Sequence, residues 1–329
     1  INKEEGEAMQ IAILLHDIGH GPFSHATEKA LLPGVHHEEV SLIIIKMFNK
    51  EFDGALDLAI QIFTNTYSRK FMHQLVSGQV DVDRLDYLKR DSFYTGVTEG
   101  NINTDRIVAM MNVDQEQLVF ESKGVHSLEK FLLARRLMYW QVYLHKTSLA
   151  AELILVKILY RFRILTESGK ESLTDSHVLF PFFNLNKASI LEESALETYL
   201  TLDDSDILAL LKRWMKHEDI VLSRLSKQLI NRDLPKVKLQ STPISEEAIN
   251  KKKDRLIHLN VSDSISDNFV FSGSVSNQTF TSDQAQILLQ EKSGKINSIA
   301  KSINYLDFEQ FSKPIHKYYL CYPKANSSL

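Results

Sequence analysis

Hydrophobic and polar positions follow a helical period through the first half of this chain. From about residue 4 to residue 170, apolar side chains return every three or four positions, and glycine and proline stand mostly between such stretches. The clearest helical stretches are residues 38–48, 55–63 and 128–160. This periodicity predicts an all-α first half with enough apolar surface to bury a large core.

The pattern changes in the second half. Residues 196–230 keep the helical period, whereas residues 256–281 alternate and are rich in Val, Ser, Phe, Asn and Asp. Residues 315–322 are also typical of a strand, and residues 287–296 weakly favour a hairpin around a Ser-Gly turn. The second half therefore predicts helices followed by a few strands.

These patterns predict a mainly α protein in three segments. A helical bundle covers residues 1–170, a helical extension covers 171–235, and a smaller C-terminal α+β region covers 236–329. Pro235 marks the start of the last segment. We expect residues 168–185 to form a loop between helices.

Composition narrows the class of protein. Hydrophobic residues make up 43% of the 329 positions and charged residues 24%, and the formal net charge is −4. This balance argues against nucleic acid as a partner, although it leaves room for a local cationic pocket that binds phosphates. The single cysteine, Cys321, cannot form an internal disulfide, and no apolar run is long enough to span a membrane. We therefore expect a cytoplasmic protein without a membrane partner.

One ten-residue run concentrates the polar chemistry. Residues 16–25 read His-Asp-Ile-Gly-His-Gly-Pro-Phe-Ser-His. An adjacent His-Asp pair suits Fe, Mn, Zn or Ni better than Ca, and a divalent ion makes a nucleophile from water at neutral pH. Pro22 predicts that the first helix ends near Gly19 and that a second one starts before His25. This break would let His20 and His25 turn towards one cavity.

A second polar group lies on another predicted helix. Along residues 81–91, one face carries two carboxylates, an aromatic hydroxyl and a guanidinium. These groups belong to Asp83, Tyr87, Arg90 and Asp91, at positions i, i+4, i+7 and i+8. The pattern is consistent with a site for a metal and a polar substrate, and equally with a salt-bridged surface helix.

The two groups together resemble a known family. A His-Asp pair followed by a distant aspartate resembles the HD-domain phosphohydrolases. The strings HDIGHGPFSH, DVDRLDYLKRDSFYTG and YLHK resemble the deoxynucleoside triphosphate triphosphohydrolase branch, over about residues 5–160. The strings FSGSVSNQTF and KYYLCYP resemble the accessory region of bacterial members. The resemblance implies that the first segment is an HD-domain helical bundle.

The resemblance also implies the metal ligands. The family holds its ion with one histidine from an earlier helix, the His-Asp pair and a later aspartate, which assigns His16, Asp17 and Asp83 here. No histidine precedes His16, and we expect the first ligand to lie in a segment before Ile1. A natural loss of that ligand would predict weak metal binding. Ligands of these types do not fix the ion, which can be Mn, Mg, Fe, Zn or Ni.

Further histidines match the active-site positions of the family. By resemblance, His20, His25 and His37 position the attacking water, contact phosphate or protonate the leaving group. Glu28 lies one helical turn after His25 and is placed to orient its imidazole. Other histidines of the helical half are expected to make structural hydrogen bonds, namely His36, His73 and His126.

The substrate contacts are expected on two helices. Cations suited to phosphate are Arg84 and Arg90, and the resemblance adds Arg135 and Lys146. On the predicted helix 128–160, four side chains are spaced by 4, 4 and 3 positions, namely Arg135, Tyr139, Tyr143 and Lys146. This spacing places them on one face of the helix, and the other face is an aromatic-rich core. By resemblance, Asp91 accepts from the 3′-hydroxyl of the sugar, and Tyr87 or Tyr143 crowds the 2′ position.

The reaction that the resemblance implies is hydrolysis of a deoxynucleoside triphosphate, with dGTP favoured, to a deoxynucleoside and triphosphate. Water attacks the α-phosphorus, and His20 or His37 protonates the departing 5′-oxygen. Two alternatives remain: an HD phosphohydrolase for a monophosphate, an alarmone or a cyclic nucleotide, and a catalytically impaired nucleotide-sensing protein. Relatives imply a homo-oligomer and leave a nucleotide activator open.

Overall fold

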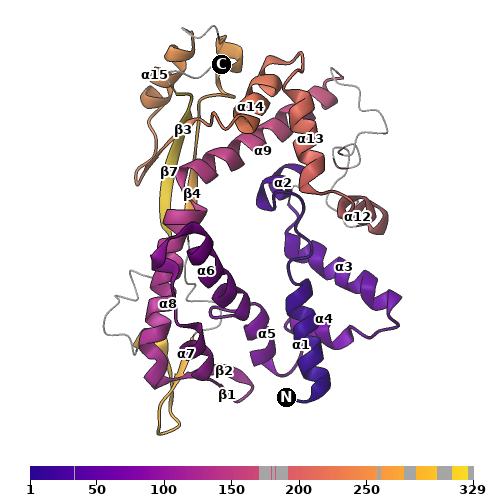
Figure 1. The fold of residues 1–329 in the computed structure, drawn as a ribbon, viewed down its shortest axis with the longest axis vertical. Coiled ribbons are helices and arrows are strands. Elements are labelled where there is room, and N and C mark those ends of the chain that lie inside the picture. Colours follow the sequence, from indigo (N-terminus) through magenta and orange to yellow (C-terminus); the bar gives the residue numbers. More distant parts are fainter. Residues whose placement is uncertain are drawn as a thin grey trace. The chain divides into compact units, whose positions relative to one another are not determined.

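The computed structural model describes residues 1–32, 34–169, 179, 182, 192–257, 261–277, 287–301 and 313–324 (Figure 1). The chain divides into two compact units, each made of separate stretches. Unit 1 comprises Ile1–His16, Ile45–His145 and Ser276–Ile315. Unit 2 comprises Asp17–Ile44, Lys146–Val275 and His316–Leu329. These boundaries differ from those of the three predicted segments, and the division into residues 1–170, 171–235 and 236–329 stays a prediction.

Unit 1 is built on short helices. They are α1 (Lys3–Leu15), α4 (Asp57–Phe63), α5 (Lys70–Val76), α6 (Val82–Thr95), α7 (Thr104–Ala109) and α8 (Val125–Met138). Helix α3 (His37–Glu51) begins in unit 2 and ends in unit 1. The helices α3 and α4 confirm the predicted helical stretches 38–48 and 55–63. The apolar faces of α1, α4, α5, α6, α7 and α8 meet in one core, where Phe131, Leu132 and Leu88 are fully buried.

Polar groups fix the start of α1. The side chains of Asn2 and Glu5 each accept a hydrogen bond from the other residue's backbone, which satisfies two free N–H groups of the first turn. The buried Glu5 also accepts from Arg69 and Tyr67. The hydrogen bond from the Asn2 backbone and those from Arg69 lower the pKa of Glu5 to about 2. Glu5 is therefore a charged anchor between α1 and the segment before α5.

Unit 1 also contains a sheet, so the expectation of an all-α first half was wrong. Strands β1 (Met111–Asp114) and β2 (Gln117–Glu121) form a hairpin. Its two turn residues, Gln115 and Glu116, have φ of 45° and 60°, a conformation usually taken by Asn-Gly or Asp-Gly. The turn therefore lacks the usual sequence signal, and the hairpin was missed.

The predicted hairpin over residues 287–296 is confirmed and completes this sheet. Strands β5 (Leu288–Gln290) and β6 (Ile296–Ser298) pair antiparallel, and β5 pairs parallel with β2 in the order β1-β2-β5-β6. Because this pairing joins residues nearly 170 positions apart, the local pattern could not place the hairpin in unit 1.

The helix predicted over residues 128–160 is interrupted. Helix α8 ends at Met138 and a π-helical turn follows over Tyr139–Tyr143. Leu144, with φ −102° and ψ 24°, leaves the helical conformation, and the next helix, α9 (Lys146–Glu167), begins only at Lys146. The stretch contains no Gly or Pro that would mark such a break, and π-helical turns often occur at functional sites. Arg135 and Lys146 therefore do not share one helix face.

Unit 2 carries the remaining described helices and a second sheet. The helices are α2 (His25–Leu31), α9, α12 (Glu193–Leu200), α13 (Asp204–Trp214), α14 (Ile220–Ile230), α15 (Glu246–Ile257) and α16 (Asp263–Ser266). The strands are β3 (Lys236–Gln240), β4 (Phe271–Asn277) and β7 (Ile315–Tyr322), in the order β3-β7-β4. The mainly α class with a smaller α+β region is confirmed, as are the helical stretch 196–230 and the strand 315–322.

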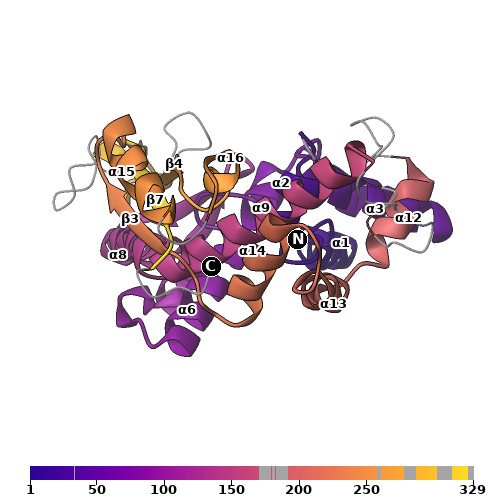
Figure 2. The same ribbon diagram turned by 90° about the horizontal axis from the view of Figure 1, so that it is seen from above.

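Only part of the alternating stretch 256–281 is a strand. Helix α15 extends to Ile257, α16 follows, and β4 begins at Phe271. Helix α15 lies beside β7 in both views (Figures 1 and 2), and Lys252 Nζ is 3.8 Å from the centre of the Tyr322 ring. Most of the predicted loop 168–185 lies outside the described residues.

Helix α9 is the longest apolar helix of unit 2. Its buried face includes Leu149, Ile154, Ile158 and Phe162. Lys29 Nζ on α2 pairs with Glu152 on α9 at 2.6 Å, which ties the two helices together. Within the described ranges, none of the helices combines the length and the hydropathy that a membrane crossing requires.

Candidate functional site

The loop between α1 and α2 carries the first candidate residues. Helix α1 ends at Leu15, earlier than the Gly19 expected from the sequence, because the His16 side chain lies at the helix end with Nδ1 2.7 Å from the Ile13 carbonyl oxygen. Helix α2 begins at His25, after Phe23 and Ser24 with φ of 55° and 47°. His16 therefore lies at the end of α1, and His25 lies at the start of α2.

Two glycines let this loop pack closely. A Cβ on Gly19 would lie 2.2 Å from the His37 carbonyl oxygen and 2.5 Å from the Ser41 nitrogen. A Cβ on Gly21 would lie 2.3 Å from the Tyr199 hydroxyl. Both positions need glycine because of this close approach. The contact at Gly19 brings the loop against the start of α3, where His37 lies.

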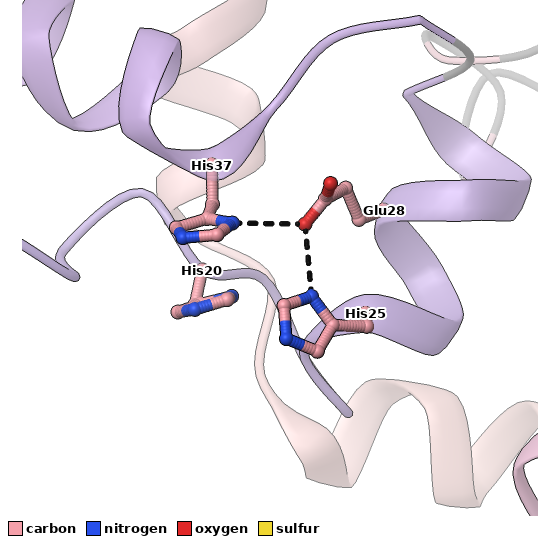
Figure 3. A group of neighbouring side chains, drawn as sticks. All are labelled: His20, His25, Glu28 and His37. Carbon is pink, nitrogen blue, oxygen red and sulfur yellow. Dashed lines mark hydrogen bonds and ion pairs between the residues drawn. The ribbon is translucent and has the colours of Figure 1, made fainter. Parts of the chain in front are cut away.

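Three imidazoles and one carboxylate form a cluster in unit 2 (Figure 3). The rings of His20 and His37 are stacked with centres 3.9 Å apart and an interplanar angle of 16°. The His25 ring stands edge-on to both, at 5.0 and 5.5 Å. The structure thus brings together all four residues that the sequence assigned to catalysis.

Glu28 connects two rings of this cluster (Figure 3). Its Oε2 lies 3.1 Å from Nδ1 of His37 and 3.3 Å from Nδ1 of His25. Burial raises the pKa of Glu28, but the hydrogen bonds to His37 and His25 outweigh it and the pKa is lowered. An ionised Glu28 keeps a proton on both Nδ1 atoms, so each ring presents Nε2 on its other edge.

His20 is about as enclosed as His37, and both are much less exposed than His25. Burial, followed by the charge of His37, lowers the pKa of His20. Its Nδ1 is buried and has no hydrogen-bond partner among the residues that the structure describes. Asp17 Oδ1 lies 4.0 Å from Nε2 of His20 and 3.9 Å from Nε2 of His37. Asp17 therefore faces the side of the cluster away from Glu28.

The other predicted metal ligands lie in unit 1. Nε2 of His16 is 3.9 Å from Oδ1 of Asp83, which is on the first turn of α6. Metal bonds of about 2.0–2.2 Å place two ligand atoms at most about 4.4 Å apart, so both atoms can bind one ion. Nδ1 of His16 is held by the Ile13 carbonyl, as is common for a metal-binding histidine. The pair is consistent with a divalent ion.

The cluster of unit 2 offers a second place for an ion. One ligand atom from each of His20, His25, Glu28 and His37 lies within 4.8 Å of the others. An ion on the Nδ1 side would have to replace the hydrogen bonds that Glu28 makes with His25 and His37. A ligand nitrogen carries no proton, so these bonds favour Glu28 as an orienting group over Glu28 as a ligand.

An aromatic group on unit 1 contains the predicted sugar contacts. The Tyr143 hydroxyl donates to Asp91 Oδ2 at 2.5 Å. The Tyr143 ring stands edge-on to Tyr87 at 6.0 Å and to Tyr139 at 5.5 Å. Burial and then the bond to Asp91 raise the pKa of Tyr143 well above its usual range, and burial raises that of Tyr87. These hydroxyls stay neutral donors at physiological pH.

The predicted phosphate-binding cations are separated in the structure. Arg84 and the buried Arg135 lie near Tyr87, and burial and then the charge of Arg84 lower the pKa of Arg135. Arg90 instead points to solvent and pairs with Asp86, at 2.9 Å, where both side chains are 61% exposed. Lys146 is exposed at the start of α9 in unit 2. Arg84 and Arg135 thus remain the cations beside the tyrosines.

Several supporting residues were missed by sequence reasoning. Gly19 N donates to Ser41 Oγ at 2.9 Å, Tyr199 donates to the Gly19 carbonyl at 3.4 Å, and Phe23 N donates to Asp204 at 2.9 Å. Two of these partners lie about 180 positions away in the sequence, beyond any local pattern. Asp81 could have been found, because it precedes a helix and accepts from Arg84 N at 2.7 Å, as a capping residue does.

Comparisons with known proteins show which families and solved structures this chain resembles. The family model of the HD domain matches residues 1–91, and the model of the HD associated region matches residues 102–175. The crystal structure of a phosphohydrolase from Bacteroides thetaiotaomicron superposes with a TM-score of 0.91 and 47% identity, over 98% of this chain and 81% of that chain. A hypothetical protein from Aquifex aeolicus, with a TM-score of 0.66 and 22% identity over 96% of this chain and 77% of that one, shares the fold.

This chain matches a smaller share of the length of its curated relatives. The uncharacterized protein YwfO of Bacillus subtilis is 37% identical over 70% of this chain and 53% of that protein. The deoxynucleoside triphosphate triphosphohydrolase SAMHD1 homolog of Dictyostelium discoideum is 33% identical over 47% of this chain and 33% of that protein. The chain therefore spans about half, or less, of the length of these curated relatives.

Proposed function

We propose that this chain, which belongs to the HD-domain phosphohydrolase superfamily, hydrolyses a deoxynucleoside triphosphate to a deoxynucleoside and triphosphate. The observation that carries the proposal is the imidazole cluster of unit 2. Three histidines present ring nitrogens next to Asp17, and one carboxylate fixes the orientation of two of them. Such an arrangement suits phosphate binding and proton transfer better than it suits structural packing.

The proposed metal ligands are His16, Asp17 and Asp83. The separation of His16 Nε2 and Asp83 Oδ1 supports this choice. Asp17 is included because it directly follows His16 in the sequence. A bound divalent ion would lower the pKa of water and polarise a phosphoryl oxygen. Its identity stays open, because histidine and aspartate accept several ions.

We assign the proton transfer to His37. Glu28 holds the proton on Nδ1 of His37, so Nε2 can carry and deliver a second proton to the departing 5′-oxygen. The lowered pKa of His20 keeps its ring neutral, which suits a hydrogen bond to the attacking water or a phosphate oxygen. His25, oriented by Glu28 on the exposed side of the cluster, is assigned to phosphate contact.

The preference for a deoxyribose rests on the tyrosines of unit 1. The Tyr143 hydroxyl already occupies one oxygen of Asp91, so Asp91 keeps its other oxygen to accept from a 3′-hydroxyl. By the resemblance, Tyr87 or Tyr143 would crowd the 2′ position and so disfavour a ribose. The preference for dGTP, the nucleotide activator, the homo-oligomer and the cytoplasmic location stay predictions.

A substrate panel tests the proposal. The protein, prepared as this chain and as the product of its whole gene, is incubated with the four deoxynucleoside and four ribonucleoside triphosphates and with Mn, Mg, Fe, Zn or Ni. ³¹P NMR should find triphosphate as the product, with deoxynucleotides, dGTP first, hydrolysed faster than ribonucleotides. Diphosphate or orthophosphate as the first product would reject this reaction. A nucleoside monophosphate, an alarmone and a cyclic nucleotide are assayed beside the triphosphates, and turnover of one of these instead would favour the alternative HD phosphohydrolase.

A further inference from the structure

Unit 1 contains a polar cavity whose lining is basic. It has a volume of about 500 Å³ and is bounded by α5, the start of α6 and β2. Among the described residues that line it, Lys70, His73 and Arg84 are basic and none is acidic. Its other lining side chains are neutral hydrogen-bonding groups, including Gln74 and Ser77. Such a lining favours an anion over a neutral or cationic ligand.

The guanidinium of Arg84 is held in place with its outer groups unused. Its Nε donates to Asp81 Oδ2 at 2.7 Å, and Asp81 itself is buried as the cap of α6. Nη1 and Nη2 make no hydrogen bond to any residue in the described part of the chain. Arg84 thus offers two fixed, charged donors.

Lys70 and His73, the two basic residues of α5, are each held by one hydrogen bond to a backbone carbonyl oxygen. Lys70 Nζ donates one proton to the Asn65 carbonyl at 2.6 Å, which leaves two donors. His73 Nδ1 lies 3.0 Å from the Ile62 carbonyl, and its Nε2 has no partner among the described residues. The structural role expected for His73 therefore accounts for only one of its two nitrogens.

The wall between these residues is rigid. Gln74 Nε2 donates to Gln117 at 3.0 Å, and Gln74 Oε1 accepts from Leu118 N at 2.8 Å. These two bonds fix α5 against β2, so the basic side chains need little rearrangement to bind a ligand. A site that is organised before binding loses less entropy when the ligand enters.

We propose that this cavity is an anion-binding site for a phosphate-bearing ligand, contacted by Lys70, His73 and Arg84. Arginine binds two phosphate oxygens at once, lysine acts as a point charge, and a neutral imidazole nitrogen can accept from a protonated phosphate oxygen. The volume exceeds what one orthophosphate needs and suits a short polyphosphate or the phosphate end of a nucleotide. Arg84 is also one of the cations expected to bind the substrate phosphates, whereas Lys70 and His73 have no part in the proposed reaction, so these two residues distinguish the cavity from the substrate site.

Histidine NMR tests the site directly. Long-range ¹H–¹⁵N spectra of the metal-free protein are recorded at constant ionic strength with orthophosphate, tripolyphosphate or GMP, and with chloride as the reference. The His73 ring signals, identified by their loss in His73→Gln, should shift saturably with a phosphate ligand. Binding of tripolyphosphate without GMP identifies an inorganic source, and binding of GMP without the inorganic ions identifies a nucleotide.

Matched variants decide whether the cavity is the site. Lys70→Gln should weaken binding about tenfold, the loss expected for one charge-assisted contact. Lys70→Arg, which keeps the charge, should retain binding, and Lys130→Gln, an exposed lysine of the same unit, should leave it unchanged. The proposal is overturned if no phosphate ligand moves the His73 signals, or if Lys70→Gln binds as tightly as the parent. Because no turnover is measured, this result is independent of the proposed reaction.

Discussion

Glu28 is the residue whose replacement probes the imidazole cluster most sharply. Glu28→Gln keeps the size of the side chain but removes its charge and leaves one acceptor oxygen for two Nδ1–H donors. The Glu28 side chain is 15% exposed, so solvent replaces the lost bond poorly. His37 should then lose its fixed orientation and the partner that stabilises its positive charge.

The size of the effect follows from the hydrogen bonds. A bond to a charged group contributes about 1.5–3 kcal/mol, and about 1.4 kcal/mol changes a rate tenfold, so the loss of one such bond should lower kcat about 10- to 100-fold. KM should change less than about threefold, because Glu28 orients imidazoles and does not itself hold the substrate.

Initial rates of triphosphate release measure the effect, with folding checked by circular dichroism. Glu38→Gln is the matched control, because Glu38 is exposed, adjacent to His37 and lacks any partner among the described residues. It should keep its rate within about twofold, as expected for a surface charge. A parent-like kcat in Glu28→Gln, or an equal loss in Glu38→Gln, would refute the assignment of Glu28 as the orienting carboxylate.

Three further predictions concern other parts of the structure. Tyr143→Phe removes the bond to Asp91 and should reduce the preference for deoxy over ribo substrates about 3- to 10-fold in kcat/KM; an unchanged ratio would contradict the sugar site. Gly19→Ala should lower the free energy of unfolding by about 1–3 kcal/mol in urea denaturation, because its Cβ would overlap the His37 carbonyl. Glu5, with its pKa lowered to about 2 from 4.5, stabilises the fold above pH 4.5 and loses this effect as the pH falls towards 2. Urea denaturation at several pH values should therefore show a weaker acid destabilisation in Glu5→Gln than in the parent.

The sequence predicted the parts of the site that lie close together along the chain. His20, His25, Glu28 and His37 fall within 18 positions, and the structure brings them into one cluster. Helical spacing placed Asp91 on one face with Tyr87, and the resemblance assigned both to the sugar, but the hydrogen bond between Tyr143 and Asp91 was not predicted. Arg90 was placed on the same face, but it pairs with Asp86 one turn earlier, since an exposed carboxylate at i−4 is its nearest partner.

The rest depended on information that local patterns do not contain. The turn at Gln115 and Glu116 uses residues that rarely adopt positive φ, and the π-helical turn at Tyr139–Tyr143 has no Gly or Pro to mark it. The supports of the loop, such as Tyr199, come from distant stretches of the chain. Such contacts form only when the whole chain has folded.

The fate of the oxygen from water tests the central claim most directly. The protein is incubated in H₂¹⁸O with dGTP and with the divalent ion that gives the highest rate in the substrate panel. The products are separated and analysed by ³¹P NMR and mass spectrometry. Attack on the α-phosphorus predicts one ¹⁸O atom in triphosphate, on a terminal phosphorus, and unlabelled deoxyguanosine. Label in orthophosphate, in diphosphate or in the nucleoside would contradict the account.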